Sequence, residues 1–254
     1  MDLGLRGRRA LVTASSKGLG RGCAEALAAE GASVYISSRR APELEEAARA
    51  IDAAGWYAAD MSVAGEPEAL VNACVDALGG LDVLVVNAGG PPPGTVQGTA
   101  LDAWEAGFEL TLMSAVRLVK ASLPFLQQSD QGRIVFITSI SVRQPIPYIA
   151  ISNAMRAGVT GLAKTLAREL AGDRITVNCI APDAILTDRL RHIAEAQGLD
   201  PEVEMRRSAE AAPMKRLGDP SEFGAVCAFL CSKQAGYVTG QTVGIDGGTL
   251  LGVH

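Results

Sequence analysis

The sequence predicts an α/β fold, with one doubly wound parallel sheet of about seven strands forming a single domain over residues 1–254. Apolar stretches of strand length alternate with helical patterns along the whole chain, as expected for a parallel sheet covered by helices. No linker or internal repeat divides the sequence, and 254 residues with 48% apolar side chains are enough for one large core. The first strand ends in a glycine-bearing turn, Leu11–Gly20, that leads into a helix.

The first half of the chain predicts four strands and three helices. The expected strands are Arg9–Thr13, Ser33–Ser38, Trp56–Ala59 and Val83–Val86. The expected helices are Gly20–Glu30, Pro42–Asp52 and Pro67–Leu78. Pro42 suits a first helical turn because the N–H of that position has no partner within the helix. The wholly apolar Val83–Val86 is typical of a strand buried in the middle of a parallel sheet.

The second half predicts three more strands and three long helices. The expected strands are Arg133–Ser139, Ile175–Ala181 and Thr242–Asp246. The expected helices are Leu101–Gln128, adjusted near Pro124, then Ile149–Ala171, and Ser221–Leu230 with Ser221 as its cap.

Between the last two strands, Leu186–Pro213 is polar, charged and irregular. We expect it to form a mobile lid over a substrate, because such insertions follow the C-terminal ends of strands. A surface helical hairpin is the alternative. Its arginines favour an anionic or carrier-linked substrate; they are Arg189, Arg191, Arg206 and Arg207.

The turn at residues 11–20, LVTASSKGLG, suits phosphate binding. Glycines let the backbone approach a pyrophosphate, and a helix N-terminus offers free N–H groups and a positive dipole end. The spacing departs from GxGxxG, so the turn alone is equally compatible with a plain strand-to-helix connection. In a Rossmann-type sheet, however, a ligand lies at the C-terminal ends of the strands, where this turn falls.

The residues after the second strand, Ser38-Arg39-Arg40, favour NADP(H) over NAD(H) as the cofactor. An acidic side chain there would accept a hydrogen bond from the ribose 2′-hydroxyl and repel a 2′-phosphate. Arg39 instead offers a planar fork of donors that suits phosphate. Lys17 would add a second positive charge nearby. Two solvated basic side chains are the alternative interpretation.

The composition excludes several classes of partner. A formal net charge of −5 gives no reason to expect nucleic-acid binding. No apolar run is long enough to span a membrane, no basic cluster suits a membrane surface, and the N-terminus lacks a signal-peptide pattern. We therefore expect a cytoplasmic protein. The five scattered cysteines and two histidines predict reduced core residues and no metal site.

Several motifs, in order, resemble those of the short-chain dehydrogenase/reductase family. The turn resembles the family's TGxxxGxG pattern, with Ala14 where the first glycine usually stands, and Asn87–Gly89 matches its NAG motif. Arg216–Gly218, Gly240–Gln241 and Asp246–Gly248 match its C-terminal pattern. The resemblance covers essentially the whole chain. It implies a nicotinamide dinucleotide, bound by Thr13, Ser15, Ser16, Lys17, Gly18, Leu19, Gly20, Arg39, Asp60, Met61, Asn87, Ala88, Gly89, Arg156 and Pro182.

The resemblance also implies a small-molecule carbonyl substrate and a homotetramer. By this resemblance, the contacts between subunits would come from Leu101–Gln128, Ile149–Ala171 and the C-terminal Gly247–His254.

The catalytic positions depart from the family pattern of Asn, Ser, Tyr and Lys. Alignment by the flanking residues keeps Ser139 at the serine position, but places Thr111, Ser152 and Arg156 at the other three. The chain thus resembles a divergent branch that lacks the Tyr-xxx-Lys pair, whose members are often described as similar to 3-oxoacyl-acyl-carrier-protein reductases. A serine hydroxyl is far less acidic than a phenol, and arginine stays protonated. We expect Ser139, Ser152 and Arg156 to be catalytic, with Tyr148 as a candidate replacement acid or a pocket-lining residue.

Three functions remain open. The first is an NADP(H)-dependent reductase of a ketone or 3-oxoacyl-type substrate with an atypical Ser/Ser/Arg site. The second is a nucleotide-binding regulatory protein without redox activity, suggested by the missing Tyr/Lys pair. The third is a non-redox enzyme on the same scaffold, weakly favoured by the Ala14 side chain in the turn.

Overall fold

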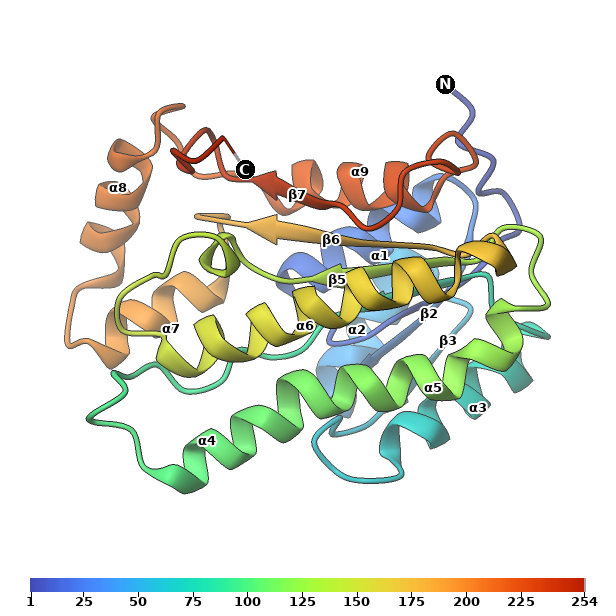
Figure 1. The fold of residues 1–254 in the computed structure, drawn as a ribbon, viewed down its shortest axis with the longest axis horizontal. Helices are drawn as coiled ribbons and strands as arrows, with labels where there is room; N and C mark the ends of the chain where they lie inside the picture. Colours follow the sequence, from blue (N-terminus) through green and yellow to red (C-terminus); the bar gives the residue numbers. More distant parts are fainter. Residues whose placement is uncertain (254) are drawn as a thin grey trace.

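A seven-stranded parallel sheet runs through the computed structural model, which describes residues 1–253 (Figure 1). The spatial order is β3-β2-β1-β4-β5-β6-β7. In chain order the strands are β1 (Arg9–Val12), β2 (Ser33–Ser38), β3 (Gly55–Ala58), β4 (Val83–Val86), β5 (Arg133–Ile137), β6 (Thr176–Pro182) and β7 (Thr242–Ile245). All neighbouring pairs are parallel, and the order reverses between β1 and β4. The predicted doubly wound fold is confirmed, and the reversal marks the expected ligand crevice.

Alternate side chains of each central strand enter two separate cores. In β1, Leu11 joins one apolar cluster, whereas Ala10 and Val12 join the other. Phe136 and Val135 of β5 divide in the same way. This alternation follows from the pleat, which points successive side chains to opposite faces. Both faces of the sheet must therefore be covered by helices.

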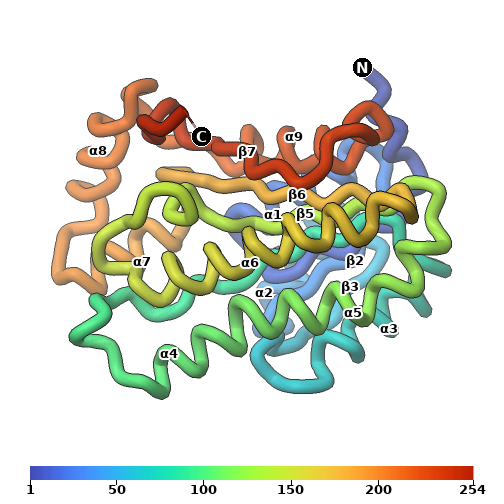
Figure 2. The backbone as a smooth tube through the Cα atoms, in the orientation of Figure 1, coloured from blue at the N-terminus to red at the C-terminus, as the bar shows by residue number. Residues whose placement is uncertain are grey.

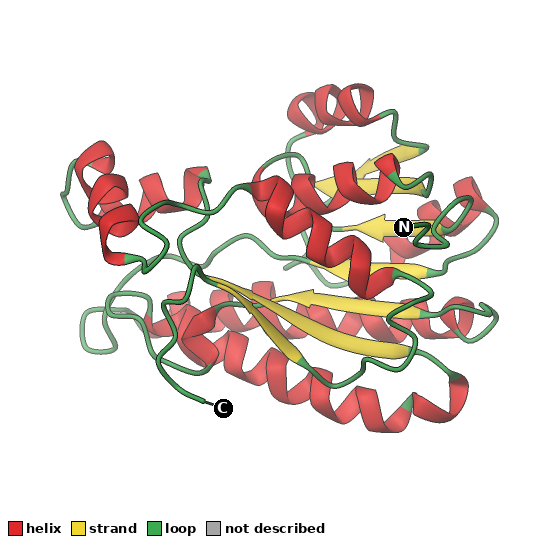
Figure 3. Cartoon of the chain, turned by 90° about the horizontal axis from the view of Figure 1, so that it is seen from above, coloured by secondary structure: helices red, strands yellow, loops and turns green. Residues whose placement is uncertain are grey.

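Three helices cover each face, as Figure 3 shows. On one face lie α3 (Glu66–Leu78), α5 (Ser114–Leu126) and α6 (Ala150–Glu169). On the other lie α1 (Gly18–Ala29), α2 (Ala41–Ile51) and α9 (Pro220–Cys231). The five cysteines are buried free thiols within this structure.

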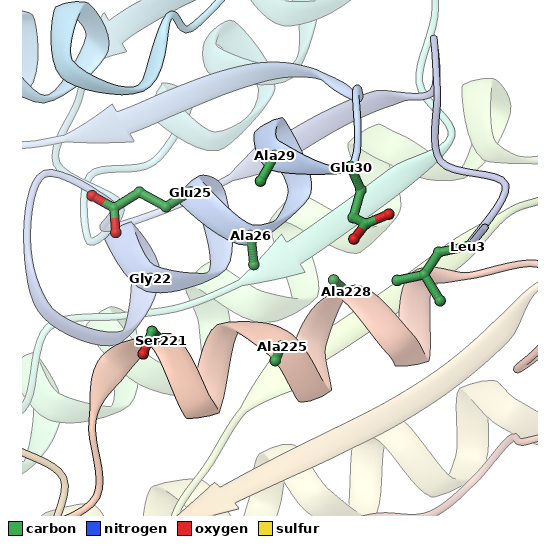
Figure 4. Close-up of a pocket in the computed structure, with 9 residues that line it drawn as sticks. All are labelled: Leu3, Gly22, Glu25, Ala26, Ala29, Glu30, Ser221, Ala225 and Ala228. Carbon is green, nitrogen blue, oxygen red and sulfur yellow. The ribbon is translucent and has the colours of Figure 1, made fainter. Parts of the chain in front are cut away.

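Helices α1 and α9 lie side by side at very close range (Figure 4). A Cβ added to Gly22 would lie 2.4 Å from the Pro220 carbonyl oxygen, and one added to Gly224 would lie 2.2 Å from the Gly22 oxygen. Small residues at this crossing let α9 support the helix that follows the glycine turn. A hollow of about 350 Å³ beside it is lined by nine residues, four of them alanines, and includes none of the predicted site residues.

Most predicted boundaries are confirmed to within two residues, and β2 and β4 agree at both ends. The strand ends correct one site residue: Ser139 follows β5, which ends at Ile137, rather than closing it. The cap of α9 was also predicted wrongly. Asp219 is the cap, accepting a hydrogen bond of 2.8 Å from the Ser221 N–H, while the Glu222 carboxylate accepts one of 2.9 Å from the Asp219 N–H. This is a capping box.

The predicted helix Leu101–Gln128 is a continuous run with a change of winding, visible as one stretch of tube in Figure 2. It consists of α4 (Leu101–Phe108), a π-helical turn at Glu109–Met113, and α5. The adjustment therefore lies at the π-turn and not near Pro124, which sits inside α5.

Two helices replace the predicted irregular lid, namely α7 (Asp188–Ala196) and α8 (Pro201–Ala211). The helical-hairpin alternative thus describes this segment better. In Figure 1 both helices lie at the side toward which the strand arrows point. Through residue 253, the chain has no helix with the length and apolar character needed to cross a membrane. The predicted tetramer contact Gly247–His254 ends at a residue outside the described part.

Candidate functional site

Buried side chains tie the turn after β1 to the end of β4. The Thr13 hydroxyl donates to the Asn87 carbonyl oxygen at 2.7 Å and accepts from the Asn87 N–H at 2.9 Å. The Ser15 hydroxyl donates to the Val12 carbonyl at 2.7 Å. The Asn87 side-chain amide donates to the Ala14 carbonyl at 3.0 Å. Thr13 and Ser15 are fully buried, so their side chains shape the turn from within.

Backbone geometry explains the glycines of this turn. Gly18 has a φ of +60°, in the left-handed region that favours glycine. A Cβ at Gly20 would lie 2.4 Å from the Ala14 carbonyl oxygen. Ala14, which replaces the family's first glycine, itself has a φ of +47°. The turn therefore keeps the close, N–H-lined shape that fits a pyrophosphate.

Lys17 is exposed, and its ammonium donates to the Asp188 carboxylate of α7 at 2.8 Å. This ion pair corrects the expectation of a free positive charge at Lys17. Its neighbours Ser16 and Leu19 are half-buried on the same turn.

Arg39 carries the free positive charge at this end of the site. It is exposed and forms no ion pair with any residue of 1–253, whereas the adjacent Arg40 pairs with Glu43 at 2.7 Å. The buried Ser38 hydroxyl beside it has no hydrogen-bond partner within the described chain. An exposed guanidinium without a carboxylate partner at the end of β2 fits the phosphorylated ribose of NADP(H).

Asp60 and Met61 follow β3 at the same edge. Burial alone would raise the pKa of Asp60, but hydrogen bonds from the Ser62 hydroxyl at 2.6 Å and N–H at 3.0 Å, with the charge of Arg39, leave that pKa lowered. Met61 is buried in the core, so only its backbone is offered to a ligand at this edge. Asp60 therefore remains an ionised acceptor at neutral pH.

The remaining predicted cofactor positions lie at the ends of central strands. Ala88 and Gly89 continue from β4 and are half-buried, and Pro182 is the buried last residue of β6. These positions therefore lie at the carboxyl ends of β4 and β6, on either side of β5.

Ser139 lies at the C-terminal end of β5, where a 3₁₀ turn begins. Its half-buried hydroxyl accepts a hydrogen bond of 3.1 Å from the Ser141 N–H. Since that bond uses only a lone pair, the hydroxyl proton stays available for a substrate oxygen.

Ser152 and Arg156 lie one turn apart on α6 and contact each other. The Arg156 Nε donates to the Ser152 hydroxyl at 3.2 Å, and its Nη1 donates to the Ile137 carbonyl oxygen of β5 at 2.8 Å. Burial, followed by repulsion from Arg189, lowers the pKa of Arg156 to about 10. Arg156 therefore remains a cation at neutral pH and is hydrogen-bonded to Ser152.

Thr111 and Tyr148 are placed differently from the other catalytic candidates. Thr111 is buried in the π-turn, and its hydroxyl has no partner within residues 1–253. Tyr148 has a φ of +65°, and its hydroxyl donates to the Ala196 carbonyl at the end of α7 at 3.3 Å. The Tyr148 hydroxyl is thus engaged by α7.

Comparison with known proteins matches residues 13–249 to the family described as Enoyl-(Acyl carrier protein) reductase. The 3-oxoacyl-[acyl-carrier-protein] reductase FabG of Vibrio cholerae is 35% identical over 252 residues, covering 98% of this chain and 100% of that protein. The chain belongs to the short-chain dehydrogenase/reductase family. It is accordingly an oxidoreductase.

Other family members agree in sequence and structure. Dehydrogenase/reductase SDR family member 4 of Homo sapiens is 34% identical over 250 residues, which are 96% of this chain and 88% of that protein. L-sorbose reductase from Gluconobacter frateurii, solved with NADPH and L-sorbose, has a TM-score of 0.94, with 35% identity and full coverage of both chains. A variant of actinorhodin polyketide ketoreductase, solved with NADPH, has a TM-score of 0.89 and 31% identity, covering 95% of this chain and 97% of the other.

Two residues of the short-chain dehydrogenase/reductase site were missed by sequence reasoning. Asp188 pairs with Lys17 across 171 positions of sequence. Arg189 was noted only as one arginine of a charged segment, yet its Nη2 donates to the Pro91 carbonyl at 2.9 Å. No local sequence pattern predicts either contact, because both depend on where α7 packs against the ends of the strands.

Proposed function

We propose that this protein is an NADP(H)-dependent reductase that transfers a hydride to a ketone or 3-oxoacyl-type carbonyl. The observation that carries the proposal is the exposed Arg39 guanidinium, which follows β2, forms no ion pair within residues 1–253 and lies 3.9 Å from the place of a Cβ at Gly89. Asp60, the acidic group nearby, is already engaged by Ser62. The NADPH in the sorbose reductase and ketoreductase structures supports the same cofactor here.

The residues of the catalytic end would orient the carbonyl and stabilise its developing negative charge. NADPH would supply the hydride when bound. Ser139 has a hydroxyl proton free to bind the carbonyl oxygen. Arg156 donates to the Ser152 oxygen, which makes the Ser152 proton a better donor to an alkoxide. Neither group is an acid of suitable pKa, so we propose that water supplies the final proton.

Titration with NADPH and NADH, followed by NADPH with a panel of ketones and 3-oxoacyl thioesters, tests the proposal. We expect oxidation of NADPH by at least one carbonyl. Ser139→Ala should then lower kcat about 100-fold, the loss typical of one donor to a developing oxyanion. Ser122→Ala, which removes a buried hydroxyl of α5 without a partner in the described chain, is the matched control. Unchanged turnover by Ser139→Ala would remove Ser139 from the mechanism.

A nucleotide-binding protein without redox activity is the second candidate. The Ser152–Arg156 contact favours it, because neither side chain can give up its proton as a general acid near neutral pH. It predicts NADPH binding without oxidation by any carbonyl. The third candidate, a non-redox enzyme, loses its support because Ala14 adopts the left-handed conformation of the turn.

We also propose a homotetramer, assembled through the long helices α4–α5 and α6. Light scattering should give the mass of four 26.3-kDa chains. A monomer at micromolar concentration would contradict this assembly without affecting the proposed reaction.

A further inference from the structure

Two arginines without acidic partners lie together at the catalytic end. Arg156 donates only to the Ser152 hydroxyl and the Ile137 carbonyl. Arg189 donates to the Pro91 carbonyl. In the described part of the chain, no carboxylate lies within 4.0 Å of either guanidinium, although the ion pairs of the protein use nine other arginines and a lysine.

Arg189 points inward from the first turn of α7. A Cβ added to Gly90 would lie 2.3 Å from its Cζ and 2.5 Å from its Nε. The guanidinium therefore lies directly against the loop that follows β4. The other arginines of this segment differ: Arg191 pairs with Glu202, Arg207 pairs with Glu204, and Arg206 is exposed.

The charge of Arg189 acts on Arg156. Burial lowers the pKa of Arg189, and burial with the charge of Arg189 lowers that of Arg156. A negative charge between two partly buried like charges would offset their repulsion. Residues 1–253 supply no carboxylate within ion-pair distance of either guanidinium, so an anionic ligand would meet no competing partner there.

The position of the pair distinguishes between two sources of the anion. The glycine turn faces α7 through Thr187, whose Cγ2 would lie 3.5 Å from a Cβ at Gly18, and through Asp188, bound to Lys17. Arg189 follows these residues, and its guanidinium lies against Gly90 and Pro91 in the loop after β4. It shares the β4–β5 end with Arg156, where the substrate of the proposed reaction would lie.

We propose that Arg189 and Arg156 form a carboxylate-binding subsite, so that the preferred substrate is an oxo acid and not a neutral ketone, ester or thioester. This inference rests on the proposed function. The planar guanidinium forks suit bidentate recognition of a carboxylate. It also assigns Arg189 a specificity role in substrate binding.

The test compares 2-oxo and 3-oxo acids of four to eight carbons with their methyl esters, using NADPH. We expect kcat/KM for the best acid to exceed that for its ester about 10- to 100-fold, the value of charge-assisted hydrogen bonds. Arg189→Gln should remove that preference, so that the acid-to-ester ratio of kcat/KM falls to about one. Arg189→Lys should restore part of it. Arg191→Gln, on the same helix and paired with Glu202, is the matched control.

Three outcomes would overturn the inference. The wild type could use acids and esters equally, or Arg189→Gln could keep the acid preference. Arg189→Gln could also weaken NADPH binding while leaving the acid-to-ester ratio intact, which would assign the anion to the cofactor's pyrophosphate.

A calorimetric titration keeps the inference separate from the proposed function. It measures the binding of acetoacetate and methyl acetoacetate to the protein saturated with NADP⁺. Selective binding of the acid that is lost in Arg189→Gln supports the subsite even if no substrate is reduced. Equal binding of acid and ester overturns it.

Discussion

The two ends of the ligand-binding edge are built in different ways. At the cofactor end, Thr13, Ser15 and Asn87 join β1, β2 and β4 through buried hydrogen bonds. At the catalytic end, Arg156 is attached to β5 by a single carbonyl and to Ser152 by its hydroxyl. The first end is held by several buried hydrogen bonds between strands, and the second by a few hydrogen bonds from long side chains.

This difference shows which part of the site tolerates chemical change. The glycine turn is hydrogen-bonded to three strands, so replacing one of its residues disturbs all three at once. The same hydrogen bonds hold the turn in shape even with Ala14 in it. The candidate catalytic positions lie on one face of α6 and just after β5, where a few side-chain hydrogen bonds hold them without shaping the helix. We therefore expect side chains at this end to be replaceable without loss of the fold.

Gly20→Ala should have the largest effect, because Gly20 lies in the turn that forms the cofactor end. The new Cβ would lie 2.4 Å from the Ala14 carbonyl oxygen and 2.8 Å from the Asn87 amide nitrogen. We expect a loss of about 1–3 kcal/mol in the free energy of unfolding, with NADPH binding lost. Urea denaturation and NADPH fluorescence titration measure the two effects. Gly172→Ala is the control, since nothing lies within 4 Å of its added Cβ.

Arg39→Asp should have the next largest effect, and it changes selectivity more than stability. The substitution removes the unpaired guanidinium and places a carboxylate where a 2′-phosphate would lie. We expect NADPH affinity to fall about 10- to 100-fold and NADH affinity to rise. Arg40→Ser removes a cation already paired with Glu43 and should leave the NADPH:NADH ratio unchanged. If Arg39→Asp also leaves it unchanged, the cofactor assignment is wrong.

The sequence predicted the sheet, its order of elements and the edge at which the site lies, since apolar runs and glycine turns are local signals. It did not predict the π-turn at Glu109–Met113, because no proline or glycine marks it. The sequence placed Lys17 near a phosphate but did not predict its partner Asp188. Asp188 lies in a polar segment that was expected to be irregular and is helical. Side-chain partners across such distances depend on tertiary packing, so the proposed carboxylate-binding subsite could be inferred only from the structure.

Ala14→Gly should strengthen the cofactor end by a smaller amount. A non-glycine residue in the left-handed region costs about 1–2 kcal/mol, partly offset by the lower entropy of its unfolded chain. With a φ of +47° at Ala14, we expect a gain of about 0.5–1 kcal/mol in unfolding free energy. Ala77→Gly, at an exposed site in α3, should lower stability by up to about 1 kcal/mol. A destabilised Ala14→Gly would show that the methyl group packs usefully in the turn.

The smallest effect concerns two carboxylates with opposite pKa shifts, one at each end of the edge. Burial opposes the change at Asp60, but the Ser62 hydrogen bonds lower its pKa below the usual 3.8. Burial, with the charge of Asp246, raises the pKa of Asp183 above 3.8 despite contacts with Thr249 and the Ala184 N–H.

Asp60 therefore contributes stability above about pH 4, which is lost as the pH falls through its lowered folded pKa. Asp183 behaves in the opposite way, because its ionisation becomes a penalty as the pH rises from 3.8 through its raised folded pKa. In urea unfolding at pH 7, Asp60→Asn should be less stable than the wild type and Asp183→Asn more stable, each by less than about 1 kcal/mol because both groups are partly solvated. At pH 3 both differences should shrink. If the two variants shift stability in the same direction at pH 7, the two ends of the edge do not differ electrostatically, and the contrast between them is limited to the arginines.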